Sequence, residues 1–113
     1  LNSSKIRIKL LVRLFFNPQT KTYLRELSKE FNVSTHSVRK ELNILTKTNL
    51  LKCEKSGRKI QYSANQEHPL FPELKSMVGK VMGIDHVIDD LAGRLGDLEK
   101  AYLIDDIDLY FKV

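Results

Sequence analysis

The chain has 113 residues, enough for one compact domain or a small domain with an appendage but too few for two independent hydrophobic cores. Charged residues make up 29% and hydrophobic residues 42%, and no apolar run approaches the roughly 18 residues that a membrane-spanning helix needs. The single cysteine, Cys53, excludes an intramolecular disulfide and a multi-cysteine metal cage. We therefore expect a cytoplasmic protein, and the start at Leu1 without a signal-like segment indicates a trimmed fragment rather than a secreted precursor.

The net charge of +5 is unevenly distributed along the chain. Residues 1–68 hold 14 lysines and arginines against five glutamates, a net charge of +9, whereas residues 69–113 hold five basic against nine acidic residues, a net charge of −4. A basic segment of this size favours a polyanionic partner for the first part of the chain and a different role for the second. A merely soluble basic surface is the alternative explanation of the charge alone.

The chain is expected to begin with a helix. In Ser4–Phe16 apolar side chains, Ile8 among them, recur at helical spacing and predict a broad buried face. Asn17-Pro18 ends this helix, because proline cannot donate into the hydrogen-bond ladder and restricts the residue before it. Thr22–Leu24 is then expected to be a short extended piece.

Two further helices are predicted to form a helix-turn-helix. Apolar spacing places them at Arg25–Phe31 and Thr35–Lys47. Between them, Asn32 tolerates a left-handed conformation and the Ser34 hydroxyl can cap the next helix. Two helices joined by three residues are typical of this motif.

A β-hairpin is predicted to follow, with strands at Leu50–Lys55 and Lys59–Ala64. Gly57 supplies the positive backbone dihedral that a short hairpin turn needs. Ile60 and Tyr62 share one strand face by the two-residue alternation, and we expect that face to pack against the helices.

The acidic remainder is predicted to contain two helices and a strand pair. The helices are expected at Leu70–Met82 and Ile84–Leu95, interrupted by Gly83, and the strands at Leu98–Ile104 and Ile107–Val113. The fold class is therefore α+β, mainly α: a winged helix-turn-helix with a β-hairpin wing, followed by two helices and a short C-terminal strand pair.

This order of elements indicates binding of double-stranded DNA. A helix fits the major groove and its first turn faces base edges, while basic groups around it contact phosphates. We expect the helix at Thr35–Lys47 to read the bases, with Arg39 donating two bonds to a guanine, and the hairpin tip and the second helix to hold the backbone. The predicted contact residues are Thr35, His36, Ser37, Arg39, Lys40 and Asn43 of the reading helix, Lys55, Arg58 and Lys59 of the wing, and Lys21 and Arg25 near the second helix.

Residues 5–71 resemble the winged helix of ArsR-like bacterial and archaeal regulators. The matching phrases are YLRELSKEF, SVRKELNIL, GRKIQYSAN and HPLF, which are specific as a set and weak singly. In particular, the chain resembles the branch in which this module is fused to a nucleotidyltransferase-like segment. The resemblance implies a transcriptional regulator, and a tail derived from that segment.

Some members of this family bind metal through paired cysteines on the reading helix, and this helix has none. The candidate ligands, His36, His68, His86 and Cys53, are too scattered for the three or four converging ligands that a metal site needs. Cys53 is expected to be a small apolar strand residue. We therefore expect no metal and no cofactor.

The resemblance also raises a catalytic alternative. In the fused relatives a Gly-Ser loop precedes an Asp-x-Asp pair that holds the metal of a nucleotide, and here Asp106 and Asp108 could imitate that pair. No Gly-Ser loop precedes them, so nothing would hold a triphosphate, and we predict a degenerate segment and no enzyme. Because Asp105-Asp106 suits a two-residue turn between paired strands poorly, a longer loop absent from this chain is a further hypothesis.

We therefore predict a DNA-binding domain at residues 1–68 and a helical linker or dimerisation segment with degenerate nucleotidyltransferase-like strands at residues 69–113. The function expected is that of a sequence-specific transcriptional regulator acting as a homodimer, because two reading helices about one helical turn apart recognise a palindrome. Two alternatives stay open: a nucleotidyltransferase-like enzyme with an attached winged helix, and a winged helix used only for protein contacts.

Overall fold

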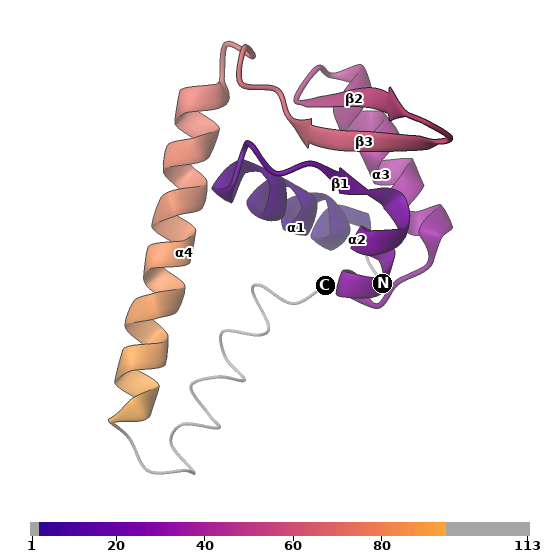
Figure 1. Ribbon diagram of the computed structural model, residues 1–113. Coiled ribbons are helices and arrows are strands. Elements are labelled where there is room, and N and C mark those ends of the chain that lie inside the picture. Colours follow the sequence, from indigo (N-terminus) through magenta and orange to yellow (C-terminus); the bar gives the residue numbers. More distant parts are fainter. Residues whose placement is uncertain (1–2, 95–113) are drawn as a thin grey trace.

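The computed structural model describes residues 3–94, which form four helices and a three-stranded antiparallel sheet (Figure 1). The prediction of a mainly helical α+β winged helix-turn-helix with a β-hairpin wing is confirmed. The elements are α1 (Ser3–Phe16), β1 (Thr22–Tyr23), α2 (Leu24–Phe31), α3 (Thr35–Lys47), β2 (Leu51–Ser56), β3 (Lys59–Ala64) and α4 (Phe71–Gly93).

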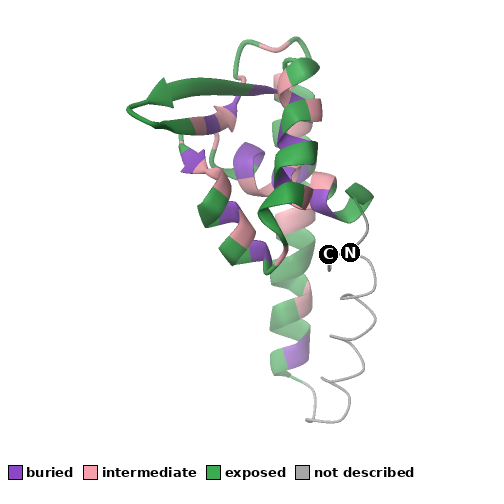
Figure 2. Cartoon of the chain, turned by 90° about the vertical axis from the view of Figure 1, so that its right-hand side faces the viewer, coloured by how far each residue is buried: buried purple, intermediate pink, exposed green. Residues whose placement is uncertain are grey.

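α1 lies at the centre of the fold and contacts α3, α4 and β3. Figure 2 shows the buried residues gathered where these elements meet, while the wing and much of α4 are exposed. Ile8 departs from the prediction, because 55% of its surface is exposed: it lies on a face of α1 that these three elements leave open. The apolar core consists of Ile6, Leu10, Leu14, Phe15, Leu27, Phe31, Val38, Leu42, Leu45, Leu51, Tyr62, Ala64 and Val78.

The turn between α2 and α3 forms as the sequence predicts. Asn32 is left-handed, with φ of 55°, and its N–H donates to the Lys29 carbonyl at the end of α2. The Ser34 hydroxyl accepts the Ser37 N–H at 3.1 Å and so caps α3, which satisfies one of the donors that a helix start leaves unpaired. A second left-handed residue, Asn49 (φ 64°), follows α3 and turns the chain toward the wing.

A partly buried ion pair joins α1 to α3. The Glu41 side chain is fully buried, and its carboxylate accepts from Nε of Arg7 at 2.7 Å and from Nη2 at 3.4 Å. Hydrogen bonding to Glu41, followed by the charge of that carboxylate, raises the pKa of the Arg7 guanidinium. Glu41 thus reaches the interior with a partner, as a buried charge requires, and fixes how the reading helix sits on α1.

The sheet has the order β1-β3-β2, so the short β1 joins the wing to the start of α2. Gly57 has φ of 66° at the hairpin turn, as predicted. The prediction for the helix-facing side is half right: Tyr62 is buried, but Ile60 is 44% exposed. Ile60 pairs with Lys55 near the hairpin tip, farther from the core than Tyr62, which pairs with Cys53.

The two helices predicted on either side of Gly83 are one continuous helix, α4, which is a correction. A glycine inside a helix costs about 1 kcal/mol relative to alanine, which weakens a helix without ending it. Within the described residues Gly57 alone among the glycines has a positive φ, so nothing in the backbone at Gly83 requires a break. The predicted strands 98–104 and 107–113, with Asp106 and Asp108, lie outside the described residues.

Candidate nucleic-acid interface

The predicted reading helix presents its polar residues to solvent. Of the eleven predicted contact residues ten are exposed and Ser37 is half-buried, so nearly all are available to a partner. On α3, residues four apart lie one above the other, which makes one row of Thr35, Arg39 and Asn43 and a neighbouring row of His36 and Lys40. The first row flanks the buried stripe that holds α3 on the core, and the second row lies opposite that stripe.

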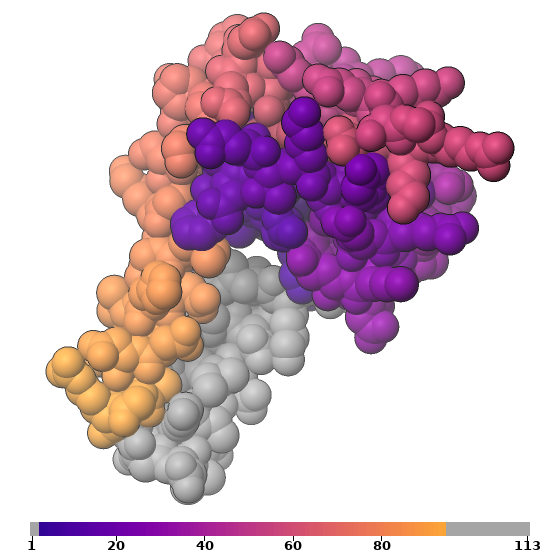
Figure 3. All heavy atoms as spheres, in the orientation of Figure 1, coloured from indigo at the N-terminus to yellow at the C-terminus, as the bar shows by residue number. Residues whose placement is uncertain are grey.

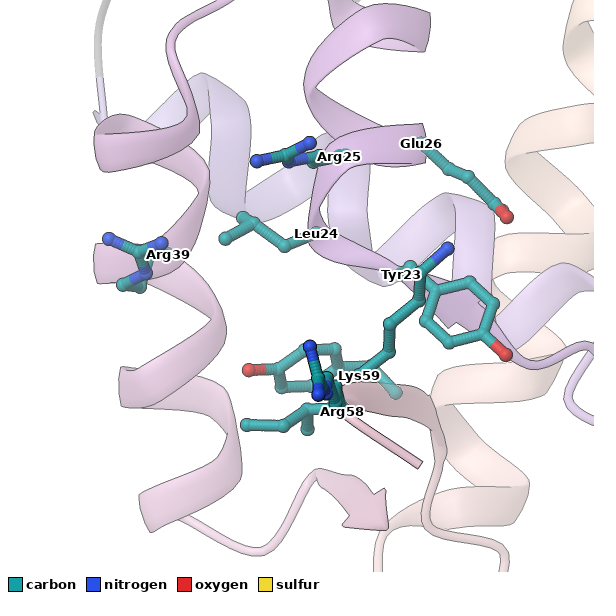
Figure 4. A pocket seen from close by; sticks show the side chains of 9 residues that line it. Tyr23, Leu24, Arg25, Glu26, Arg39, Arg58 and Lys59 are labelled. Atoms are coloured by element: carbon teal, nitrogen blue, oxygen red, sulfur yellow. The ribbon is translucent and has the colours of Figure 1, made fainter. Parts of the chain in front are cut away.

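A hollow of about 410 Å³ lies between the start of α2, the middle of α3 and the wing (Figure 4). Arg39 reaches it from α3, Arg25 from α2, and Arg58 and Lys59 from the wing. Helix α2, helix α3 and the wing therefore bring four of the predicted contact residues together. The other lining residues are Tyr23, Leu24, Glu26, Ile60 and Tyr62.

Glu26 is the one carboxylate among the lining residues of this hollow. Its side chain points away from Arg39, to the opposite side of α2, in Figure 4. It accepts a hydrogen bond from Oγ1 of the buried Thr22 at 3.1 Å. Within residues 3–94 none of the four cations has a carboxylate within 4.0 Å, so the surface is suited to an anion.

Tyr23 ties the wing to α2, and sequence reasoning missed this role. It pairs with Gln61 across β1 and β3, and its phenol oxygen accepts from Nε2 of Gln61 at 2.8 Å. Nζ of Lys59 lies 5.2 Å from the centre of the Tyr23 ring, within the range of a cation–π contact. The high β-propensity of Thr22 and Tyr23 predicts an extended piece, but the sequence does not show which strand pairs with it.

Tyr62 forms part of the floor of the hollow. Burial raises the pKa of its phenol and the nearby Cys53 thiol adds to the rise, whereas the positive charge of Arg39 lowers it. Tyr62 therefore keeps its proton at neutral pH and offers a neutral hydroxyl beside Arg39. The hollow combines apolar surface at its floor with positive charge around it.

The remaining predicted residues lie around this hollow or away from it. Lys55 is exposed on β2, and the Ser37 hydroxyl lies 2.8 Å from that of Ser34, so Ser37 takes part in the cap. Lys21 does not line the hollow: its Nζ lies 3.7 Å from Glu54 of β2. The structure thus brings Arg25 to Arg39 and the wing but sets Lys21 apart.

No group of three or more His, Cys, Asp or Glu side chains in residues 3–94 is arranged to hold a metal ion. Cys53 lies on the predicted strand β2, and its side chain is exposed. None of the helices in the described part of the chain is long and apolar enough to cross a membrane.

The sequence matches the family model described as penicillinase repressor over residues 18–92, well over half of the chain. The chain belongs to the penicillinase repressor family. The match includes the helix-turn-helix, the wing and most of α4. A search of curated protein sequences gives no match.

Solved structures with a similar fold are winged-helix proteins of low sequence identity. An apo double mutant of ZitR from Lactococcus lactis has a TM-score of 0.68 at 15% identity, over 96% of this chain and 81% of that one. The adhesin competence repressor AdcR from Streptococcus pyogenes has a TM-score of 0.63 at 18% identity, over 94% and 77% of the two chains. Wild-type ZitR in complex with DNA has a TM-score of 0.56 at 14% identity, over 97% and 73%. At these identities the likeness concerns the fold.

Membership of the penicillinase repressor family and a winged-helix fold together identify this protein as a DNA-binding transcriptional regulator. The predicted function is confirmed at this level, and so is the resemblance to winged-helix regulators in its general form.

Proposed function

We propose that this penicillinase repressor family member binds a specific palindromic site in double-stranded DNA as a homodimer and regulates transcription in the cytoplasm without catalysing a reaction. The observation that carries the proposal is the convergence of Arg25, Arg39, Arg58 and Lys59 from three elements around one hollow beside the exposed rows of α3. ZitR, which shares the fold, has been seen in complex with DNA.

In this proposal α3 enters the major groove. Its exposed rows then face base edges, and Arg39 has the fork of donors that matches guanine. One DNA strand passes through the hollow, where Arg25, Arg58 and Lys59 contact phosphates and the apolar floor meets the sugars. The wing protrudes from the body (Figure 3), so its basic tip can reach the backbone beside the groove. Thr35, His36, Ser37, Lys40, Asn43, Lys55 and Lys21 are proposed as further contacts at the edges of this footprint.

The homodimer is proposed to form along α4. Leu70, which caps the start of α4, and Met77, Ile84 and Leu91 within α4 are spaced seven residues apart, and between 48% and 62% of each is exposed. Seven residues are almost two helical turns, so these side chains form one stripe along the helix. A different stripe, with Leu74 and Val78, packs on the core. Two apolar stripes on one helix are the pattern expected when one holds the domain and the other holds a second copy.

We also propose that the chain is an ArsR-like regulator of the branch fused to a degenerate nucleotidyltransferase-like segment. Its DNA-binding domain then ends at residue 68. The alternatives are an enzyme and a module for protein contacts alone. The four convergent cations favour DNA over both, since neither alternative needs them.

Selection of duplexes from a random library by the full chain tests this function. We expect enrichment of an inverted repeat whose half-sites lie about one helical turn, roughly 10 base pairs, apart. As a matched control, Lys75→Ala removes an exposed positive charge on α4 outside the interface and should select the same site. Failure to enrich any sequence would contradict specific binding, and enrichment of single unpaired half-sites would contradict the dimer.

A further inference from the structure

A second hollow, of about 390 Å³, lies between α1, α2 and α4 and shares no lining residue with the hollow of the proposed DNA interface. Most of the surface that lines this hollow is apolar. Phe16, at the end of α1, is 41% exposed although its ring is large and apolar. The lining residues are Lys9, Val12, Arg13, Phe16, Asn17, Thr20, Glu30, Phe31 and Met82.

The two cations at this hollow differ in whether a carboxylate neutralises them. Nε of Arg13 donates to both carboxylate oxygens of Glu30, at 2.9 and 3.2 Å, so this charge is paired. Lys9 has no carboxylate within 4.0 Å among residues 3–94, and its Nζ lies 5.2 Å from the centre of the Phe31 ring. The hollow therefore has a net positive charge, located at Lys9 beside an aromatic face.

We propose that this hollow binds a small organic anion with an aromatic body. The rings of Phe16 and Phe31, with Val12 and Met82, would contact the apolar body, and the ammonium group of Lys9 would contact the anionic group. The volume lies in the range of small-molecule sites, roughly 300 to 1,000 Å³, and an apolar lining with a few polar groups is typical of them. Such a ligand would touch α1, α2 and α4 at once, away from the DNA interface.

Calorimetric titration of the full chain with 2-naphthoate tests the site, and 2-naphthalenemethanol serves as the probe with the same rings and no charge. We expect 2-naphthoate to bind one site per chain with a Kd on the order of 1 mM or lower, as its size suggests. The alcohol should bind about fivefold more weakly, because it lacks the contact with Lys9.

Three variants separate this site from general binding to apolar surface. Lys9→Gln should bring the affinity for 2-naphthoate down to that for the alcohol, whereas Phe16→Ala should weaken both probes by about tenfold. Ile8→Ala, at an exposed apolar residue of α1 outside the hollow, should change neither.

Three results would overturn the proposal. The first is the absence of saturable binding at 10 mM probe, roughly ten times the expected Kd. The second is an unchanged preference for the anion in Lys9→Gln. The third is a change in oligomeric state for Phe16→Ala with no change in probe binding, which would assign the hollow to a second copy of the chain.

Discussion

Arg39 and Lys59 reach the same hollow from different elements, and we propose that they have different roles in DNA binding. Arg39→Ala should weaken binding to the selected site by about 1 to 3 kcal/mol and relax the preference at one base position, because a bidentate contact to a base is lost. Lys59→Ala should weaken selected and random duplexes alike, because phosphates carry no sequence information. Fluorescence anisotropy with both duplexes measures this. Equal losses on both duplexes for Arg39→Ala would contradict its reading role.

The two arginines of α1 provide a matched pair for stability. Arg7→Ala leaves the fully buried carboxylate of Glu41 without its partner. Arg13→Ala, in contrast, breaks an ion pair with Glu30 in which both side chains are partly exposed to water. A surface pair contributes about 0 to 1 kcal/mol, and an orphaned buried charge costs more. Thermal unfolding should therefore show a larger fall in Tm for Arg7→Ala. A fall no greater than that of Arg13→Ala would show that Glu41 is not buried as described.

At the scale of single residues, local chemistry could be predicted from sequence when it depended on neighbours in the chain. The Ser34 cap, left-handed Asn32 and Gly57 are of this kind, since each follows from side-chain size and backbone preference. The roles of Tyr23 and Glu41 were missed, because their partners, Gln61 and Arg7, are 38 and 34 residues away. Sequence spacing does not reveal such pairings.

Among the elements, two glycines test how the wing and α4 are built. Gly57→Ala should cost about 1 to 2 kcal/mol, because alanine enters the left-handed region at a steric cost. Gly83→Ala should stabilise by about 0.5 to 1 kcal/mol, since an added Cβ meets nothing within 4 Å and alanine favours a helix. Chemical denaturation of both variants measures the two changes. Destabilisation by Gly83→Ala would restore the predicted break between two helices.

Element boundaries were predictable where apolar spacing and a stop signal coincided, as for α3, whose predicted and observed bounds are both Thr35–Lys47. The error at Ile60 and the unpredicted exposure of Ile84 and Leu91 on α4 share one cause. Alternation and helical spacing identify an apolar face, but they do not say whether another element covers it. Ile60 extends past the core along the wing, and Ile84 and Leu91 lie on a stripe that is exposed in the single chain.

For the whole molecule, the proposed dimer predicts that a charge on the outer stripe of α4 separates the copies. Met77→Asp should raise the dimer dissociation constant by at least about tenfold, because an unpaired carboxylate is buried at the interface. Ser76→Asp adds the same charge one residue away and off the stripe, and should leave the dimer intact. Sedimentation equilibrium distinguishes the two. A dimer that tolerates both substitutions equally would place the interface elsewhere.

The salt dependence of duplex binding by the full chain tests the proposed DNA interface. If Arg25, Arg39, Arg58 and Lys59 contact DNA, the logarithm of the association constant should fall linearly with the logarithm of salt concentration, by about 0.9 for each phosphate neutralised. Lys59→Ala should make this slope shallower by the equivalent of about one phosphate contact per chain, while Lys75→Ala should leave the slope unchanged. A chain that retains no duplex even at low salt would show that it does not bind double-stranded DNA.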